Sequence, residues 1–311
     1  MPTAPRARRN YRWYDLNPRR LGGWFAGLVR ALAAPLGKTA SARTAAHTAN
    51  RLAPIVPVHT PRGVLRFRCP SFTAARRATR FLVSEPETRA WLEEYAKPGD
   101  HMWDVGANVG LHALYACLLP GVTVTAFEPV PNTFAVLADN VAINGFGERA
   151  SCLCLGLSDA NAMVPIYLTD ADAGTTMHAL GAPVNVAGAF EAAGVVNVLT
   201  ARGDELVARF GVTAPRHLKI DVDGHELRVL KGLRSLLPGV RSVWIEMLEG
   251  AHNADENSRI ESLLTEAGFE KRHRAGMNQL FVKLPRSILC RASRVRPAYA
   301  VPAADSSHRK R

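Results

Sequence analysis

Cysteine is scarce in this 311-residue sequence, and no cysteine stands in a C-x-x-C pair. The five present are Cys69, Cys117, Cys152, Cys154 and Cys290. An odd number without paired spacing indicates neither a disulfide framework nor a zinc site. Unpaired thiols fit a reducing cytoplasm, which is where we expect the protein to act.

An uninterrupted apolar run long enough to cross a bilayer is also missing. The nearest candidate is residues 21–36, which Arg30 and three glycines interrupt. Arg19 and Arg20 before this run and Ala40-Ser41-Ala42 after it resemble parts of an export signal, but the interruptions argue against one. We therefore expect neither a membrane span nor a cleaved leader.

Acidic residues are almost absent from the two ends of the chain. Residues 1–84 hold 16 lysines and arginines and one acid, Asp15, and residues 285–311 hold seven and one, Asp305. Residues 85–284 carry 25 acids against 16 lysines and arginines, so the net charge of +12 resides at the ends. A mildly acidic centre argues against a nucleic-acid groove across a catalytic face, so we expect no nucleic-acid partner.

This distribution divides the chain into three regions. We interpret residues 1–56 as a basic arm and linker, residues 57–284 as the folded domain, and residues 285–311 as a basic, disordered tail. Residues 38–56, rich in Ala, Thr and Arg, are interpreted as linker. A helix within the arm would place on one face, with Arg30 opposite, the apolar residues Trp24, Phe25, Leu28, Val29 and Leu32. Such a helix suits the surface of an anionic membrane, and packing on the domain or on a partner chain is an equal alternative.

The centre of the chain alternates strand-like and helix-like segments. Strands are expected at 64–68, 101–103, 122–127, 151–157, 163–168, 197–200, 217–220 and 240–247, and helices at 85–96, 111–119, 133–143, 204–210, 224–236 and 258–267. Ser84 is the expected N-cap of the first helix, with Glu87 three residues on. Residues 170–197 look like a Gly/Ala-rich insertion, and 269–273 and 279–284 like a closing antiparallel pair. The pattern predicts an α/β fold, a doubly wound and mostly parallel sheet with a terminal antiparallel hairpin.

Carboxylates follow three of these strands. Asp104 opens the stretch Asp104-Val-Gly-Ala-Asn-Val-Gly110, Glu128 follows strand 122–127, and Asp221 follows strand 217–220. The carboxyl ends of parallel strands meet at one edge of the sheet, where open α/β folds bind their ligands. These three side chains therefore mark a predicted binding crevice.

The glycine-rich stretch lacks the G-x-G-x-x-G spacing that admits a dinucleotide pyrophosphate. Gly106, Asn108 and Gly110 instead give G-x-N-x-G behind Asp104, which suits a ligand with an ammonium group better than one with phosphates. S-adenosylmethionine has that ammonium, a ribose diol for Glu128 to bind, and no phosphate. We predict a methyl-donor site from these five residues. A ligand-free turn or another kind of nucleotide site is the alternative.

From about residue 65 to residue 284 the sequence resembles the FkbM family of S-adenosylmethionine-dependent methyltransferases. The matching residues are Lys97-Pro-Gly-Asp100, Asp104 to Gly110, Phe127-Glu-Pro129, Leu157-Ser-Asp159, Lys219-Ile-Asp-Val-Asp-Gly224 with Glu226, and Ile245-Glu246. Two departures are Asp223, where the family more often has Glu, and His225, where it usually has a small residue. The resemblance implies a Rossmann-like fold similar to the class I methyltransferases, and O-methylation of a hydroxyl on a sugar, glycan or natural product.

The reaction implied by this resemblance needs a hydroxyl oxygen held in line with a sulfonium methyl and a base for the hydroxyl proton. The catalytic candidates are Asp221, His225 and Glu246, with Asp221 or Glu246 contacting the acceptor and His225 as a candidate base. For His225 the alternative is a role at the start of a helix. Asp159, at the end of strand 151–157, either accepts a hydrogen bond from the adenine amino group or forms a turn. No ligand spacing requires a metal, so we predict none; Asp221 and Glu246 with Asp223 would be the alternative ligands.

Two other classes of function compete with this interpretation. One is an RNA methyltransferase whose basic ends contact phosphates, and the other is a non-catalytic, membrane-associated scaffold. The acidic centre and the lack of an aromatic-basic RNA motif weigh against the first. The complete set of Asp104, Gly106, Glu128 and Asp221 weighs against the second. We expect a cytoplasmic enzyme that is peripheral to a membrane if its arm binds one.

Overall fold

The computed structural model describes residues 18–185, 187–250 and 253–283, and its centre is a seven-stranded sheet of order β14-β15-β13-β12-β3-β4-β5. The parallel strands are β3 (His101–Val105), β4 (Thr123–Phe127), β5 (Ala150–Leu153), β12 (His217–Ile220) and β13 (Ser242–Glu246). The hairpin β14 (Phe269–Ala275) and β15 (Asn278–Lys283) closes the sheet, with β15 antiparallel to β13. The predicted mostly parallel sheet with a terminal antiparallel hairpin is confirmed.

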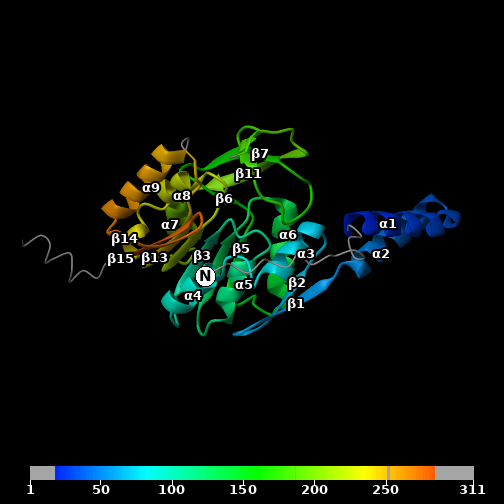
Figure 1. Ribbon diagram of the computed structural model, residues 1–311, viewed down its shortest axis with the longest axis horizontal. Helices are drawn as coiled ribbons and strands as arrows, with labels where there is room; N and C mark the ends of the chain where they lie inside the picture. The colour runs from blue at the N-terminus through cyan, green and yellow to red at the C-terminus, as the bar shows by residue number, and fades with distance from the viewer. Residues whose placement is uncertain (1–17, 186, 251–252, 284–311) are drawn as a thin grey trace, which may run out of the picture.

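Helices cover both faces of this sheet (Figure 1). One face carries α4 (Pro86–Tyr95), α5 (Leu111–Leu118) and α6 (Pro131–Ile143), and the other carries α7 (Gly203–Phe210), α8 (Glu226–Gly232) and α9 (Ala254–Glu266), with the short turn η2 (Leu237–Gly239). Along β3 the side chains alternate between the two cores: Met102 packs in the first, and Trp103 and Val105 pack in the second. The sheet is therefore doubly wound.

The order of the strands reverses beside β3. The chain runs outward from β3 through β4 and β5 on one side, and it returns to β12 and β13 on the other. Such a switch point opens a crevice at the carboxyl ends of the two adjacent strands. Here those ends are followed by Gly106 and Asp221, so the topology places the predicted motif residues at the crevice.

A second, smaller sheet lies beyond the end of β5 (Figure 1). It has the order β6-β11-β7-β8, formed by β6 (Gly156–Leu157), β7 (Ala162–Leu168), β8 (Ala179–Leu180) and β11 (Gly194–Ala201); β9 (Val184–Asn185) pairs with β10 (Gly188–Ala189). The expected single strand over 151–157 is wrong. β5 ends at Leu153, and Gly156 instead pairs with Thr200 of β11. The insertion thus begins inside the segment that the sequence assigned to one strand.

The N-terminal part differs most from expectation. It consists of α1 (Pro18–Ala33), the 3-10 turn η1 (Ala34–Leu36), α2 (Lys38–Leu52), the hairpin β1 (Ile55–Thr60) with β2 (Gly63–Arg68), and α3 (Phe72–Arg80). The expected helix across residues 24–32 is confirmed within α1. The linker interpretation of residues 38–56 is wrong, because most of that segment is α2 and β1 starts at Ile55. The segment is rich in alanine and has no glycine or proline between residues 39 and 52, a composition that permits a helix.

The start of α4 also differs. Ser84 is not its N-cap: the Ser84 backbone N–H donates to the Arg80 carbonyl at 2.8 Å and so extends the turn that ends α3. The residue before α4 is Glu85, in the left-handed conformation with φ of 48°. No helix of the described part of the chain is long and apolar enough to cross a membrane. The predicted tail, residues 285–311, lies outside the described residues.

Candidate functional site

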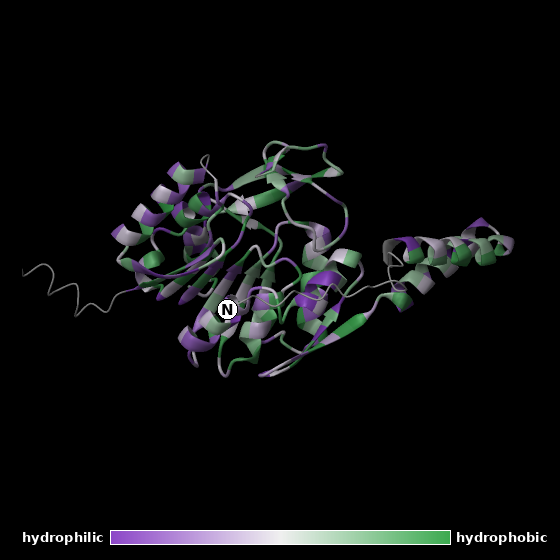
Figure 2. Ribbon diagram, in the orientation of Figure 1, coloured by the Kyte–Doolittle hydropathy of each residue, from purple (hydrophilic) through white to green (hydrophobic). Residues whose placement is uncertain are grey.

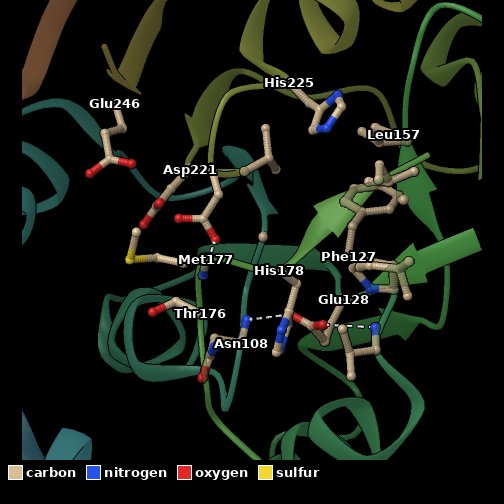
Figure 3. Close-up of a pocket in the computed structure, with 18 of the residues that line it drawn as sticks. Asn108, Phe127, Glu128, Leu157, Thr176, Met177, His178, Asp221, His225 and Glu246 are labelled. Atoms are coloured by element: carbon tan, nitrogen blue, oxygen red, sulfur yellow. Dashed lines mark hydrogen bonds between the residues drawn. The ribbon is translucent and has the colours of Figure 1, made fainter. Parts of the chain in front are cut away.

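A cavity of about 420 Å³ opens at the carboxyl ends of β3, β4, β12 and β13. Six predicted site residues line it, namely Gly106, Asn108, Glu128, Asp221, His225 and Glu246 (Figure 3). Three predicted residues, Asp104, Gly110 and Asp159, are not among the residues that line it. The predicted residues therefore converge at the strand ends as expected, except that Asp104, Gly110 and Asp159 do not reach the cavity surface.

The glycine-rich loop is shaped by close backbone contacts. Gly106 has φ of 79°, and a Cβ there would lie 1.9 Å from the Asp221 carbonyl oxygen, so only glycine fits between the two loops. Gly110 has φ of 91°, and a Cβ at this position would lie 2.6 Å from the side chains of Leu114 and Leu137. Gly110 therefore permits the turn into α5 and does not face the cavity.

Asn108 stands where a dinucleotide loop has its second glycine. Its φ of 51° lies in the left-handed region, which asparagine tolerates better than most residues. Its side-chain oxygen accepts from the Val109 N–H at 2.9 Å, and its Nδ2 donates to the Thr175 carbonyl at 3.2 Å. Asn108 thus fixes its own turn and ties the loop to the insertion.

Glu128 is buried at the end of β4, and both of its carboxylate oxygens are oriented by backbone donors. Oε2 accepts from the Asn108 N–H at 3.0 Å, and Oε1 accepts from the Val130 N–H at 2.8 Å. Burial raises the pKa of this carboxyl to about 7, against the opposing effect of the two hydrogen bonds. The carboxylate is therefore held in one orientation at the cavity wall.

Asp104 lies behind the cavity wall, almost fully buried beside Lys219. Burial raises the pKa of Asp104, and the Lys219 ammonium and the Ala113 backbone oppose that rise. Neither group makes a close hydrogen bond with the Asp104 carboxyl, and Lys219 Nζ lies 3.7 Å from its Oδ1. Lys219 Nζ approaches Asp221 Oδ2 more closely, at 3.0 Å. Burial alone would raise the pKa of Asp221, yet the ion pair with Lys219 lowers it. Asp221 is therefore held as an anion at the cavity wall.

The other carboxyl groups near the end of β12 behave in the opposite way. Burial, reinforced by repulsion from Asp221, raises the pKa of Asp223 to about 6, of Glu226 to about 7 and of Glu246 to about 8. Glu226 Oε1 accepts from two amide N–H groups of its own loop, as expected for a residue that starts a helix. No group of side chains among the described residues has the arrangement of a metal site.

His225 and Asp159 share the other end of the site. Figure 3 shows His225 near Leu157 on one side of the cavity and Glu246 on the other side, with Asp221 between His225 and Glu246. Burial lowers the pKa of His225, Arg228 lowers it further, and Asp159 opposes both. Asp159 Oδ1 accepts from the Ser158 hydroxyl at 3.2 Å. The structure brings Asp221 and Glu246 to one part of the cavity and His225 to another.

The insertion forms a roof over the cavity, defined here as residues 175–178. The Met177 N–H donates to Asp223 Oδ2 at 2.7 Å, and the Met177 carbonyl accepts from Asn185 Nδ2 at 2.8 Å. Both Met177 and Asp223 have positive φ, 62° and 52°. No hydrophobic period in the sequence marks residues 175–178, because their backbone is irregular, so the roof was not predicted.

Two further lining residues, Arg77 and Glu85, were also missed. Arg77 comes from α3 and Glu85 from the residue before α4. In the sequence Arg77 stands in a generally basic stretch, and Glu85 was assigned to the interior of a capped helix start. No signal in the sequence separates these two residues from their charged neighbours.

The comparisons with known proteins can be placed on this geometry. The family model described as the methyltransferase FkbM domain matches residues 104–271, which is more than half of the chain. The chain belongs to the FkbM methyltransferase family. The match spans Asp104, Glu128, Asp221 and Glu246, and it leaves out Arg77 and Glu85.

Two curated relatives carry FkbM-type names or activities. The hexuronic acid methyltransferase AglP of Haloferax volcanii is 32% identical over 190 residues, which cover 60% of this chain and 71% of AglP. The 31-O-demethyl-FK506 methyltransferase FkbM of Streptomyces tacrolimicus is 31% identical over 173 residues, covering 49% of this chain and 66% of that protein. A solved FkbM methyltransferase from Methylobacillus flagellatus aligns with a TM-score of 0.41 and 16% identity over 68% of this chain; the chain spans 53% of that protein.

Glu128 should matter for folding as well as for binding. We expect Glu128→Ala to lower the free energy of unfolding by about 1–3 kcal/mol for each of the two backbone N–H groups left without an acceptor. Glu128→Gln, which keeps one carbonyl oxygen, should lose less. Urea denaturation at pH 8 measures both, with Glu191→Ala, an exposed acid of the insertion, as the control. Parent-like stability of Glu128→Ala would show that the two hydrogen bonds do not support the fold.

Proposed function

We propose that the protein transfers a methyl group from S-adenosylmethionine to a hydroxyl of a sugar, glycan or natural product. The observation that carries this proposal is Glu128, which lines the cavity beside the glycine-rich loop. Backbone N–H groups orient both of its carboxylate oxygens. A carboxylate fixed in this way can accept hydrogen bonds from both hydroxyls of a ribose. The methyltransferase family of the chain and the absence of a phosphate-binding glycine pattern agree with this donor.

The walls of the cavity fit the rest of the donor. Apolar side chains gather at one end, namely Phe127, Leu157, Ile166 and Leu180, and they suit an adenine ring. Gly106, where a Cβ would meet the Asp221 carbonyl, lets the glycine-rich loop and the loop after β12 approach closely at the cavity wall. When bound, the donor supplies an electrophilic methyl group on a sulfonium sulfur. The protein's own part is to bind, orient and accept a proton.

Glu246 is the best candidate for the proton acceptor. Asp221 is a weak base, because its ion pair with Lys219 holds its pKa low. Glu246 has a pKa raised to about 8, so its ionised form takes up a proton readily near neutral pH. A sulfonium cation in the cavity would favour that ionised form. Asp221 then serves to accept a hydrogen bond from the acceptor and to hold it in line.

The acceptor class follows from the relatives' names, which specify a hexuronic acid and an O-demethylated natural product. A hexuronic acid offers hydroxyl groups and also a carboxylate. Methylation of a carboxylate gives an ester and needs no base, because that oxygen carries no proton. Since Glu246 is poised as a base, we favour the hydroxyl and an ether product. Ester formation is the second candidate.

Incubation with methyl-labelled donor tests the proposal. The acceptors are hexuronic acid glycosides, neutral glycosides, a hydroxylated polyketide and total RNA. We expect the label on a saccharide or polyketide and resistant to mild alkali, as an ether is. Release of the label by alkali would identify an ester, transfer to RNA would favour the RNA methyltransferase alternative, and a failure to bind the donor would overturn the proposal.

The assignment of the base makes its own prediction. Because Glu246 must be ionised, kcat/KM for the acceptor should rise with pH until Glu246 is ionised, with a midpoint below the pKa of about 8 that the group has without the donor's sulfonium cation. Glu246→Gln should lower kcat by about a hundredfold or more and remove that rise. His225→Asn, at the other end of the cavity, should change kcat only a few-fold. The assignment is wrong if the glutamine variant keeps the pH dependence, or if the His225 variant loses it.

A further inference from the structure

We propose that Arg77 and Glu85 bind the amino-acid end of the methyl donor, an inference that rests on the proposed use of S-adenosylmethionine. That end carries a carboxylate and an ammonium group on one carbon. A site for it needs one fixed cation and one fixed anion close to the glycine-rich loop. The motif residues of the family match do not provide that pair at the cavity surface, whereas these two do.

Arg77 supplies the cation. Among the described residues that line the cavity, it is the only lysine or arginine. Its Nε donates to the Gly174 carbonyl at 2.6 Å, which orients the guanidinium, while its two terminal nitrogens make no hydrogen bond to any described residue. Its charge lowers the pKa values of Glu128 and Asp221, so it acts on both walls of the cavity.

Lys219 cannot take this role. Its ammonium is buried, lies 3.0 Å from Asp221 and 3.7 Å from Asp104, and does not line the cavity. Its charge is thus already matched by two carboxylates of the protein. Arg77, with free donors in a planar guanidinium, can instead bind a carboxylate through two parallel hydrogen bonds.

Glu85 supplies the anion. It precedes α4 in a left-handed conformation that is costly for a residue other than glycine, and its side chain lines the cavity. Its charge raises the pKa of Asp104 and of Lys219, and its Oε2 lies 4.0 Å from His112 Nε2 of α5, so it lies on the β3–α5 side of the cavity. Asp104 itself is behind the wall, so Glu85 is the carboxylate that a ligand ammonium can reach there.

The buried ring of His112 leaves Glu85 free for this contact. His112 Nε2 lies 4.0 Å from Glu85 Oε2 and makes no hydrogen bond within the described part of the chain. Burial lowers the pKa of His112 well below its usual value, so the imidazole is neutral near pH 7. The Thr88 hydroxyl donates to Glu85 at 3.3 Å and orients it. No cation of the protein forms an ion pair with this carboxylate among the described residues.

Two ligands that differ only at the relevant end test the inference. S-adenosylhomocysteine carries the amino acid, and 5′-methylthioadenosine keeps the adenine, ribose and thioether without it. By calorimetry, Arg77→Met and Glu85→Gln should each weaken binding of S-adenosylhomocysteine by about ten- to a hundredfold, the scale of a charge-assisted hydrogen bond. Binding of methylthioadenosine should stay within about twofold. Arg77→Lys should recover part of the loss.

Arg76→Met is the matched control, because Arg76 is exposed on the same helix and does not line the cavity. It should bind both ligands as the parent does. Equal losses for both ligands, or no loss for either, would overturn the role of Arg77 and Glu85 while leaving the proposed function standing. A parent protein that binds neither ligand would overturn the proposed donor and this inference with it.

A second inference rests on a different part of the molecule, the pair of helices α1 and α2. We infer that this helical hairpin binds an anionic lipid bilayer. In Figure 1 the two helices lie side by side and extend away from the central sheet. Their exposure, composition and charge each support a lipid surface as the partner.

The helices pack against each other through small residues. Ala33 of α1 is buried and Val29 is half-buried, and on α2 the half-buried residues Ser41, Ala45 and Thr48 recur at helical spacing. The large apolar residues of α1 point elsewhere and are 40–71% exposed; they are Leu21, Trp24, Phe25, Leu28 and Leu32. They recur at the three- and four-residue spacing that places them on one side of a helix. Figure 2 colours parts of the α1 and α2 ribbons green, for hydrophobic residues, between pale and purple stretches.

The charge of the hairpin selects the partner. Residues 18–52 contain six lysines and arginines and no aspartate or glutamate. Tryptophan, phenylalanine and leucine beside unopposed basic residues fit the interface of an anionic bilayer, where each lysine or arginine near the surface is worth about 1 kcal/mol. A second copy of the same hairpin would bring like charges together, so self-association through this face is disfavoured.

Flotation of the full chain with vesicles tests this inference. We expect binding to phosphatidylglycerol-containing vesicles, weak binding to pure phosphatidylcholine, and loss on raising the salt concentration. Replacing both Trp24 and Phe25 by Ala should lower vesicle binding at least tenfold without changing donor affinity. The control is Phe210→Ala, because Phe210 is 72% exposed on α7 and should not contribute.

Three results would overturn the lipid assignment. They are a parent that does not bind anionic vesicles, an equal loss of binding in the Phe210 control, and a concentration-dependent dimer that the double replacement abolishes. The last result would identify a second copy as the partner. Unchanged thermal unfolding of the domain in each variant separates these outcomes from misfolding.

Discussion

The site depends on one buried ammonium group. Lys219 lies in the central strand β12, and its Nζ is 3.7 Å from Asp104 of β3 and 3.0 Å from Asp221, which follows β12. Without this cation Asp221 would repel the nearby carboxylate of Asp104, which is almost fully buried. Removing one partner of such a buried pair typically costs about 3–5 kcal/mol, because the other charge is left uncompensated. The close approach of Gly106 to the Asp221 carbonyl is possible only if the two strand ends can lie together.

The same cation divides the carboxylates into two chemical kinds. Asp221, in direct contact with Lys219, has a lowered pKa, whereas Glu246 faces Asp221, Asp223 and Glu226 and has its pKa raised to about 8. Two groups of the same acid type thus acquire different proton affinities from their surroundings alone. An environment that separates proton affinities in this way is how protein sites assign one carboxylate to charge and another to proton transfer.

The sequence was most informative where topology brings distant residues together by rule. Parallel strands must end at one edge, so Glu128 and Asp221 could be assigned to one crevice before any coordinates. Asp104 was assigned to the same crevice, but it lies one residue before the end of β3 and is buried behind the wall. The sequence was least informative where a residue reaches the cavity from a loop or helix outside the central sheet. Arg77 reaches the cavity from α3, whose buried residues Ala74 and Ala78 are small and stand among arginines, so the helix gives little apolar signal. Glu85 lies in a left-handed turn and the roof in an irregular insertion, and neither has a periodic pattern. Ser84 misled because a cap motif says nothing about the helix that ends just before it.

The strand-end residues and the roof over the cavity are connected, and this connection bears on how an acceptor could be selected. The family match begins at Asp104, so the strand-end residues Glu128, Asp221 and Glu246, to which we assign the donor and the proton, lie within the matched region. The roof is attached to that fold at two left-handed residues, through Asn108 to Thr175 and through Asp223 to Met177. Such conformations cost about 1–3 kcal/mol each and persist only where the surroundings hold them. The position of the roof is therefore set by the glycine-rich loop and the loop after β12. If these loops bind the donor as we propose, a surface for the acceptor beneath the roof would be aligned with the methyl group by the same contacts.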